Sequence, residues 1–505
     1  MVTHNALYTD PLRADDTGLA GTLDEWFARY PSGAIPFTYA CQLGAEDRGI
    51  QWFCESDRGW SNRDETRVVR LMPRQEEVVL AVAMVDKPLK LSGPWRTTFG
   101  ITILPVKDAS FGRAIVTAAE GHPAAEPVNL DEGRRRQFFD AYRAAGITHI
   151  FIYMNDDDFF GCPRIYAPQS EVAVRQFVER AHKEGFGVIP YAGWGVNANI
   201  PDFDTFGQEM LAQPITNIGC GCFLHNPASV FADWWLAGAK HTIEQIGMDG
   251  IYLDGTALPT LITNELDGFS WTDAQNRIHG TYPIWAIRHF LERLYVYTHV
   301  EAPKCAVVRN HYSRQQLYCL GAFCDQHLNG ENYYHKGKTV LEVATPGEFR
   351  AFFMTHLNGV ATWGMWPGWL NLPVTPNEMQ GMFLLHDVPR DVGGGVVCYH
   401  AHDVGYGRDK EPWVRIKRLR DEMADAEFVG YWLKSPWLSA SQLGRWQAAG
   451  WTVRPAGHSS SSQISLQRLG QERCTSTSPP SAWGLTLSSQ TLCSTTPCPW
   501  SETGL

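Results

Sequence analysis

The stretch that decides the fold is THIFIYMNDDDFFGCPRIYAPQSEVAVRQFVERAHKEGFGVIPY, residues 148–191. It begins with a short apolar run, 148–153, which is typical of a buried parallel strand. A helical period follows, because Val174, Phe177, Val178 and Ala181 fall on one face and Gly185 can end the helix. A second apolar run, 186–191, comes next. The segment is therefore predicted to be a strand–helix–strand unit.

The same unit repeats along the chain. Helical segments near 229–246 and 283–299 lead to further apolar runs, and the predicted strands lie at 114–117, 148–153, 186–191, 250–254, 305–309, 322–325, 360–363 and 396–399. Eight strands alternating with helices are what a (β/α)8 barrel requires. A doubly wound open sheet is the alternative, but no GxGxxG follows an early strand. The pattern therefore favours a central TIM barrel over residues 111–430.

A different pattern precedes the barrel. Residues 35–110 alternate apolar and polar positions between turn clusters, and 77–85 and 98–104 have the composition of strands. We expect an N-terminal β-sandwich here, after an extension at 1–34. The chain is thus predicted to be a multi-domain protein that combines a β domain with an α/β domain.

The C-terminal part is expected to hold a truncated β-domain. Residues 431–455 would be its beginning, and residues 456–505 are crowded with Ser and Thr and lack Val, Phe, Tyr, Lys and Asp. Such a composition buries little apolar surface. We predict a disordered or frameshifted tail. Translation of the underlying DNA beyond Pro455 in the other two frames tests the second reading.

The amino-acid composition disfavours several classes of binding partner. The formal net charge is −11 and no basic run occurs, which argues against nucleic-acid binding. The first residues lack the basic and apolar segments of a secretory signal, and no apolar run is long enough to span a bilayer. We therefore expect a soluble, cytoplasmic protein without a membrane partner. The twelve cysteines lack paired CxxC spacing, so most are expected to be buried free thiols rather than zinc ligands.

Polar and aromatic residues follow the predicted barrel strands, where the active sites of such barrels lie. Aromatic rings stack on sugars and Asn, His and Arg hold hydroxyls, while facing carboxylates can perform glycoside hydrolysis. The catalytic candidates are Asp254, Asp325 and Glu331. The candidates for substrate binding are Tyr153, Asp156, Trp194, Asn197, His279, Arg309, His311, Asn329, Trp363 and Trp366.

Each candidate also has a structural interpretation. Asp254 could cap the following turn, and Asp325 and Glu331 compete for one role. The run 156–158 could bind a cation or sugar hydroxyls, or could be a solvated acidic turn, and it lacks EF-hand spacing. The histidines could serve local hydrogen bonds, and the tryptophans at 363–369 could be core. No metal and no cofactor is predicted.

Several segments resemble a known family. MDGIYLDGT around Asp254, HGTYPIWAIRHFLERLY with His279, AFCDQHLNGEN and GVATWGMWP are similar to the barrel of uncharacterised proteins related to glycoside hydrolase family 123. GIQWFCESDRGW and FGITILPVKD resemble the β-sandwich of the same group. The resemblance covers roughly residues 40–440 and implies a β-sandwich followed by a catalytic barrel.

The chemistry of that family does not carry over. Its characterised members are β-N-acetylgalactosaminidases that use an adjacent Asp–Glu pair, whereas such pairs in this chain fall at helix starts or inside helices. The YLDG segment is instead similar to the fourth strand of α-galactosidase-like barrels, which implies Asp254 as nucleophile and Glu331 or Asp325 as acid/base. We therefore expect a retaining glycoside hydrolase acting on a carbohydrate. The alternative is a non-catalytic carbohydrate-binding protein on the same barrel. The sugar and the oligomeric state stay open.

Overall fold

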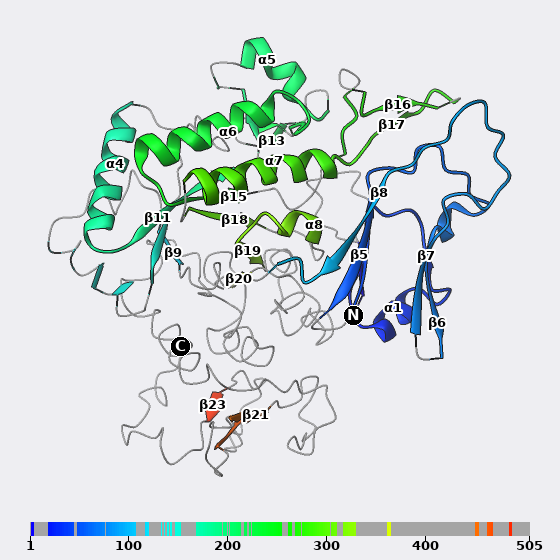
Figure 1. The fold of residues 1–505 in the computed structure, drawn as a ribbon, viewed down its shortest axis with the longest axis horizontal. Helices are drawn as coiled ribbons and strands as arrows, with labels where there is room; N and C mark the ends of the chain where they lie inside the picture. The colour runs from blue at the N-terminus through cyan, green and yellow to red at the C-terminus, as the bar shows by residue number, and fades with distance from the viewer. Residues whose placement is uncertain are drawn as a thin grey trace, which may run out of the picture.

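The structure is a computed structural model (Figure 1). It describes most of residues 19–107 and 168–329, together with shorter stretches at 2–4, 117–120, parts of 133–152, 361–364, 450–453, 462–467 and 484–486. Among these residues, no helix is both long and apolar enough to cross a membrane. The five cysteines that the structure describes as free thiols are buried, in agreement with the prediction from their spacing; they are Cys41, Cys54, Cys305, Cys319 and Cys324.

The N-terminal part, which we call the β-domain, consists of two antiparallel sheets between Val2 and Lys107. The first has the order β2 (Leu19–Gly21), β1 (Val2–His4), β4 (Ala40–Gly44), β5 (Gly49–Cys54) and β8 (Phe99–Leu104). The second has the order β3 (Ala34–Ile35), β6 (Val69–Arg74) and β7 (Glu77–Val82). The strands predicted at 77–85 and 98–104 are therefore confirmed as β7 and β8.

The predicted boundary at residue 34 is wrong. Strand β1 pairs with β4, and helix α1 (Leu23–Arg29) places Trp26 in the core that the two sheets share. The helix begins with a capping box, in which the Thr22 hydroxyl accepts the Glu25 N–H and the Glu25 carboxylate accepts the Thr22 N–H. The first 34 residues thus supply strands and a helix to the β-domain, and short strands of this length carry too weak an alternation to be found from sequence.

The second part of the chain is a parallel sheet of seven described strands. Their order is β20 (Ala361–Gly364), β19 (Gln326–Asn329), β18 (Ala306–Asn310), β15 (Gly250–Asp254), β11 (Gly187–Gly193), β10 (His149–Ile152) and β9 (Thr117–Glu120). Each strand pairs with the next one along the chain, which is barrel order, whereas a doubly wound sheet reverses its order at a switch point. The doubly wound alternative is therefore wrong. The predicted eighth strand, 396–399, lies outside the described residues.

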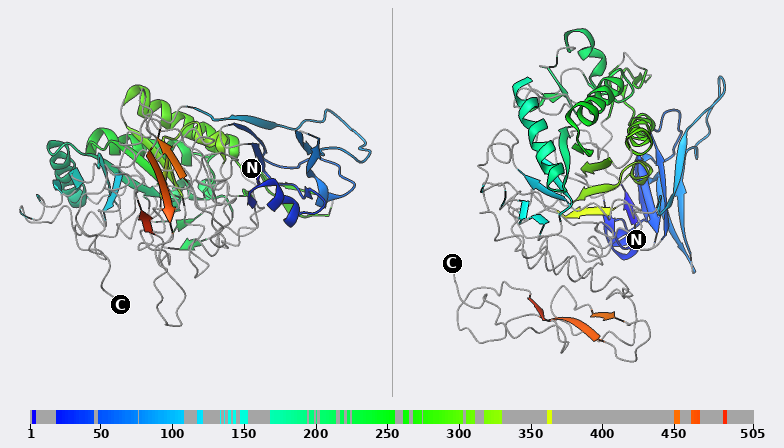
Figure 2. Two further views of the ribbon diagram at one scale, coloured as in Figure 1. Left: turned by 90° about the horizontal axis from the view of Figure 1, so that it is seen from below. Right: turned by 60° about the vertical axis from the view of Figure 1, so that its left-hand side comes forward.

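Helices cover one side of this sheet (Figures 1 and 2). They are α4 (Pro168–Lys183), α6 (Phe231–His241) and α7 (Ile284–Val296), with α5 (Phe203–Met210) above them and the short α8 (Tyr318–Gly321) before β19. The apolar face predicted for α4 is buried, and Gly185 after this helix has a φ of +87°, which glycine adopts without strain. Single π-helical turns, Thr242–Ile246 and Tyr297–Glu301, extend α6 and α7.

The two parts share one hydrophobic core. Tyr39, Ala40 and Phe53 of the β-domain belong to the same buried cluster as the strands of the parallel sheet and the helices that cover it. The ring of Tyr39 lies 4.6 Å from that of Tyr282, and the ring of Phe53 lies 5.0 Å from that of Trp285. The other face of β4 and β5 packs against the three-stranded sheet through Cys41, Trp52 and Cys54. Strands β4 and β5 are therefore packed on both faces, whereas Phe99, Ile101 and Ile103 of the edge strand β8 are exposed.

Two short strands follow Pro455, in the segment for which the composition predicts a disordered or frameshifted tail. Strands β21 (Gly450–Val453), β22 (Ser462–Gln467) and β23 (Gly484–Thr486) form a small antiparallel sheet that lies apart from the parallel one (Figure 2). In β22, Ile464 and Leu466 alternate with polar residues, which is the period of a strand. The serine-rich composition around it conceals this short alternation. The frameshift reading of the tail stays a prediction.

Candidate functional site

The carboxyl ends of neighbouring strands meet at one edge of the parallel sheet. Asp254 is the last residue of β15 and pairs with Gly193, the last residue of β11. On the other side of β15, Leu253 pairs with Arg309 of β18. Asp254 is therefore at the position where barrels of this type place their catalytic groups.

The next strands bring further candidates to the same edge. Asn310 at the end of β18 pairs with Leu328, and Leu328 pairs with Trp363 of β20. Asn329 ends β19 and pairs with Gly364. The backbone thus brings together four of the predicted residues, namely Asp254, Arg309, Asn329 and Trp363, over four adjacent strands.

The remaining candidates differ in how far the structure describes them. Asn197 lies on β12 (Val196–Asn197), which belongs to a small antiparallel sheet with β14 (Cys222–Phe223) and β13 (Asn217–Gly219) after β11. Six further predicted residues lie outside the described part of the chain; they are Tyr153, Asp156, Trp194, His311, Glu331 and Trp366.

His279 is the one predicted binding residue whose side chain is described. It lies on β17 (Ile278–His279), which forms a hairpin with β16 (Trp271–Thr272) directly before α7. Its ring stacks on that of Trp271 at 5.2 Å, and its Nε2 lies 2.9 Å from Oδ2 of Asp273. The contact with His279 and N–H groups of Arg277 hold the pKa of Asp273 far below its usual range. The hydrogen bond between His279 and Asp273 thus fixes a partly exposed imidazole on the hairpin.

A residue of the β-domain lies beside this hairpin and was missed by the sequence reasoning. Glu55 directly follows β5, and its Oε1 accepts the backbone N–H of Trp285 at 2.7 Å. Its backbone carbonyl accepts the N–H of Tyr282 at 3.0 Å. Burial raises the pKa of the Glu55 carboxyl to about 7, against the opposing effect of the N–H groups of Trp285 and Ile284. No local signal marks Glu55, since its partners are more than 200 residues away in the chain.

The predicted position of Asp325 after the sixth strand is wrong. Strand β19 begins at Gln326, so Asp325 precedes it and lies at the amino edge of the sheet, opposite to Asp254. The side chain is 2% exposed, and its Oδ2 accepts the Val307 N–H at 2.8 Å, near the start of β18. The apolar run 322–325 that suggested a strand is the turn after α8, whereas the strand itself reads QHLN.

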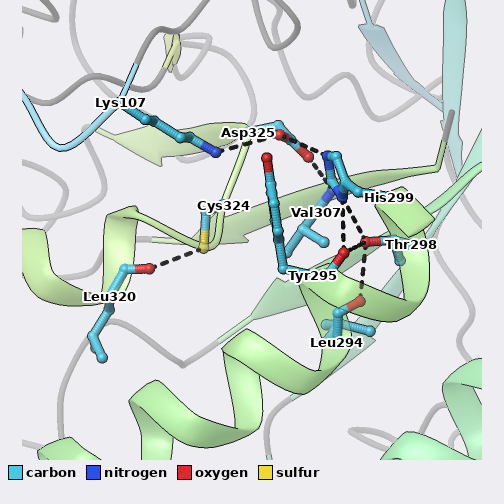
Figure 3. A network of polar contacts seen from close by, with 9 residues as sticks. All are labelled: Lys107, Leu294, Tyr295, Thr298, His299, Val307, Leu320, Cys324 and Asp325. Atoms are coloured by element: carbon cyan, nitrogen blue, oxygen red, sulfur yellow. Dashed lines mark hydrogen bonds and ion pairs between the residues drawn. The ribbon is translucent and has the colours of Figure 1, made fainter. Parts of the chain in front are cut away.

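A polar network surrounds Asp325 at this edge (Figure 3). Oδ1 of Asp325 lies 3.2 Å from Nε2 of His299 and 3.5 Å from Nζ of Lys107. The His299 ring stacks on Tyr295 with 3.6 Å between centroids, and Lys107 Nζ lies 4.6 Å above the same tyrosine ring. Burial, and then the charge of Asp325, raise the pKa of Tyr295 to about 12. The network pairs a buried carboxylate with two basic side chains and joins the β-domain to the parallel sheet.

Metal binding has no support among the side chains that the structure describes. Within them, no group of three or more His, Cys, Asp or Glu residues is arranged to hold a metal ion. The acidic run 156–158, for which a cation remained an alternative, lies outside that part.

Comparison with known proteins identifies a similar fold for this chain but does not assign the chain to a family. Neither a protein-family model nor a curated protein matches the chain, so the resemblance to family 123 stays a prediction. Solved structures of glycoside hydrolases do match. The alpha-galactosidase from Lactobacillus brevis superimposes with a TM-score of 0.50 at 11% identity, over 94% of this chain and 65% of that chain.

A second match is a variant of the GH36 alpha-galactosidase AgaA from Geobacillus stearothermophilus, in complex with stachyose. It has a TM-score of 0.51 at 11% identity, over 88% of this chain and 63% of that chain. The chain thus spans less than two thirds of the length of either enzyme. At such identities the similarity shows a glycosidase-like fold alone.

Proposed function

We propose that this chain is a glycoside hydrolase with its catalytic centre at the carboxyl edge of β11, β15, β18, β19 and β20. The observation that carries the proposal is the position of Asp254 as the last residue of β15, in register with the end of β11. Catalytic residues of (β/α)8 enzymes come from the ends of several strands at this edge. The glycosidase-like fold agrees with this class of reaction.

Asp254 is proposed as the nucleophile and Glu331 as the acid/base. In a retaining mechanism Glu331 protonates the glycosidic oxygen while the Asp254 carboxylate attacks the anomeric carbon, and the leaving group departs. Water then hydrolyses the glycosyl-enzyme, with Glu331 taking the proton of the water. Asp325 is omitted from the pair because it precedes its strand and pairs with His299 and Lys107 at the amino edge.

The substrate is proposed to be a carbohydrate held by the aromatic and polar residues at the same edge. Arg309 and Asn329 would bind hydroxyls, and Trp363 would stack on a sugar ring. Galactosides are the first choice for a screen, since the two matched structures are alpha-galactosidases and one of them holds stachyose. Tyr153, Asp156, Trp194, Asn197, His279, His311 and Trp366 complete the proposed binding set.

Hydrolysis of a panel of aryl glycosides, α-galactosides first, tests the proposal. Asp254→Asn is expected to reduce turnover by at least a thousandfold while sugar binding is retained. Asp249→Asn is the matched control, because Asp249 precedes the same strand at its other end and its carboxylate accepts the Val188 N–H. A wild-type protein that binds sugars and hydrolyses none of the panel supports the alternative of a carbohydrate-binding protein.

A further inference from the structure

Helix α7 is held by the β-domain at both of its ends. The helix follows β15 and runs back along the sheet, so its first turn lies at the carboxyl edge and its last turn at the amino edge. Strands β5 and β8 pair over their full length beside it, with Cys54 opposite Phe99 and Gly49 opposite Leu104. The residues that follow these two strands, Glu55 and Lys107, therefore meet opposite ends of α7.

The contact at the first turn of α7 is a hydrogen bond to the helix backbone. Pro283 precedes the helix and supplies no side-chain cap, while the Glu55 carboxylate accepts the N–H of Trp285. A negative charge at this end is favoured by the helix dipole, and the accepted N–H would otherwise lack a partner within the helix. The Tyr282 N–H donates to the Glu55 carbonyl one turn earlier. Glu55 thus holds the chain both before and after Pro283.

The segment that Glu55 holds begins at the hairpin of His279. Only Gly280, Thr281 and Tyr282 separate His279 from Pro283. Arg58, three residues after Glu55, lies 5.3 Å from the ring of Trp271, on which His279 stacks. The turn 55–58 of the β-domain therefore contacts both the segment that follows the hairpin, at Tyr282, and the ring of Trp271 within the hairpin.

We infer that Glu55 is a positioning residue that fixes segment 278–285, and with it His279, at the rim of the site. The carboxylate acts through the helix terminus and touches no reacting atom. An effect of Glu55 on hydrolysis rests on the proposed function. The positioning of segment 278–285 by Glu55 does not depend on it. The β-domain thereby supports the position of a residue at the proposed site.

Hydrogen–deuterium exchange, measured peptide by peptide, tests the positioning. Glu55→Ala is expected to raise exchange in peptides covering 281–287 at least tenfold and to leave 290–296 within twofold of the wild type. Glu55→Gln is expected to restore protection, because its amide oxygen can accept the same N–H. Glu65→Ala is the control, since Glu65 lies exposed on the 3-10 turn Glu65–Arg67 of the β-domain. Equal exchange in Glu55→Ala and wild type overturns the inference. Exchange in Glu55→Gln that is as fast as in Glu55→Ala overturns it as well.

Kinetics separate this inference from the proposed function. With an active wild type, Glu55→Ala is expected to raise KM severalfold, with kcat changed less, and Glu55→Gln to return KM toward the wild-type value. Unchanged KM in Glu55→Ala overturns the link to the site. A wild type that hydrolyses no glycoside contradicts the proposed function, while the exchange experiment still decides the role of Glu55. If Glu55→Ala does not fold, Glu55→Asp replaces it, since its carboxylate is one methylene short of the helix.

Discussion

Asp325 and Val307 are joined by two hydrogen bonds that run in opposite directions. The Val307 N–H donates to the Asp325 carboxylate at 2.8 Å, and the Asp325 N–H donates to the Val307 carbonyl at 2.7 Å. The pair aligns the start of β18 with the residue before β19. The Asp325 carboxylate therefore orders two strands at the amino edge of the sheet. It lies far from the catalytic centre that we propose at the carboxyl edge.

Asp325→Asn is therefore expected to lower stability and to spare turnover. The variant loses the charge that faces His299 and Lys107, which costs about 1–3 kcal/mol for a buried group. Urea unfolding measures the loss, and the rate per folded molecule should stay within a few-fold of wild type. Lys107→Met, which removes one partner of the same carboxylate, is expected to act in the same direction. A folded Asp325→Asn variant whose turnover is a hundredfold slower than that of wild type would instead indicate that Asp325 is one of the two catalytic carboxylates.

Glu55 should make stability depend on pH. Its pKa in the folded protein is about 7, above the ordinary value of a glutamate, so the folded state holds the proton more tightly than the unfolded chain. The free energy of unfolding contributed by Glu55 is thus greatest below about pH 4.5 and falls as the pH rises to 7, by up to about 3 kcal/mol.

Urea unfolding at pH 5 and pH 8 checks this dependence. Glu55→Gln lacks the titration and keeps an acceptor for the helix, so its loss of stability between the two pH values is expected to be smaller than that of wild type. Parallel pH profiles for wild type and Glu55→Gln would contradict the prediction. Glu65→Gln serves as the control for removal of an exposed glutamate.

The separation of the two proposed carboxylates predicts the stereochemistry. A retaining enzyme holds the carboxyl carbons of Asp254 and Glu331 about 5 to 5.5 Å apart, and an inverting enzyme holds them about 6.5 to 9.5 Å apart. We expect the shorter distance and a first product that keeps its anomeric configuration, as followed by proton NMR. An inverted first product would assign Asp254 the role of a base that activates water.

The tryptophans after the seventh strand are predicted to bind sugar. Trp366→Ala is expected to weaken sugar binding about fivefold, since stacking contributes on the order of 1 kcal/mol, and to leave the Tm nearly unchanged. Calorimetric titration and thermal unfolding measure the two quantities. Trp235→Ala is the contrast, because Trp235 is fully buried in the core and its truncation should lower the Tm. Normal binding with a large fall in Tm for Trp366→Ala would identify that residue as core.

Much of the parallel sheet was predictable because most of its strands are apolar and its helices are amphipathic. Predictions at 250–254 and 305–309 agree with β15 and β18 to within a residue. The sixth strand failed because Gln326–Asn329 is polar, while the apolar residues before it belong to a turn. An apolar run shows that a segment is buried and not that it is extended, so Cys324, fully buried in that turn, was misleading.

The contacts between the two parts of the chain were not predictable. Glu55 meets Trp285 across 230 positions, and Lys107 meets Asp325 across 218. Nothing in the local sequence distinguishes these two residues from solvated charges on a turn. The position of Asp254 at the end of a strand, in contrast, was predictable because it depends only on that strand. Local patterns therefore located the edge of the sheet, whereas the partners that support it depend on tertiary packing.

The shared core of Tyr39 and Phe53 with the barrel has a consequence for modularity. A gene fragment cut near residue 110 would encode the parallel sheet and its helices without the aromatic side chains that pack on Tyr282 and Trp285. Such a fragment would expose apolar surface and promote aggregation. Domain shuffling that transfers this α/β part alone is disfavoured for the same reason. The two parts are therefore expected to be inherited, expressed and engineered as a single unit.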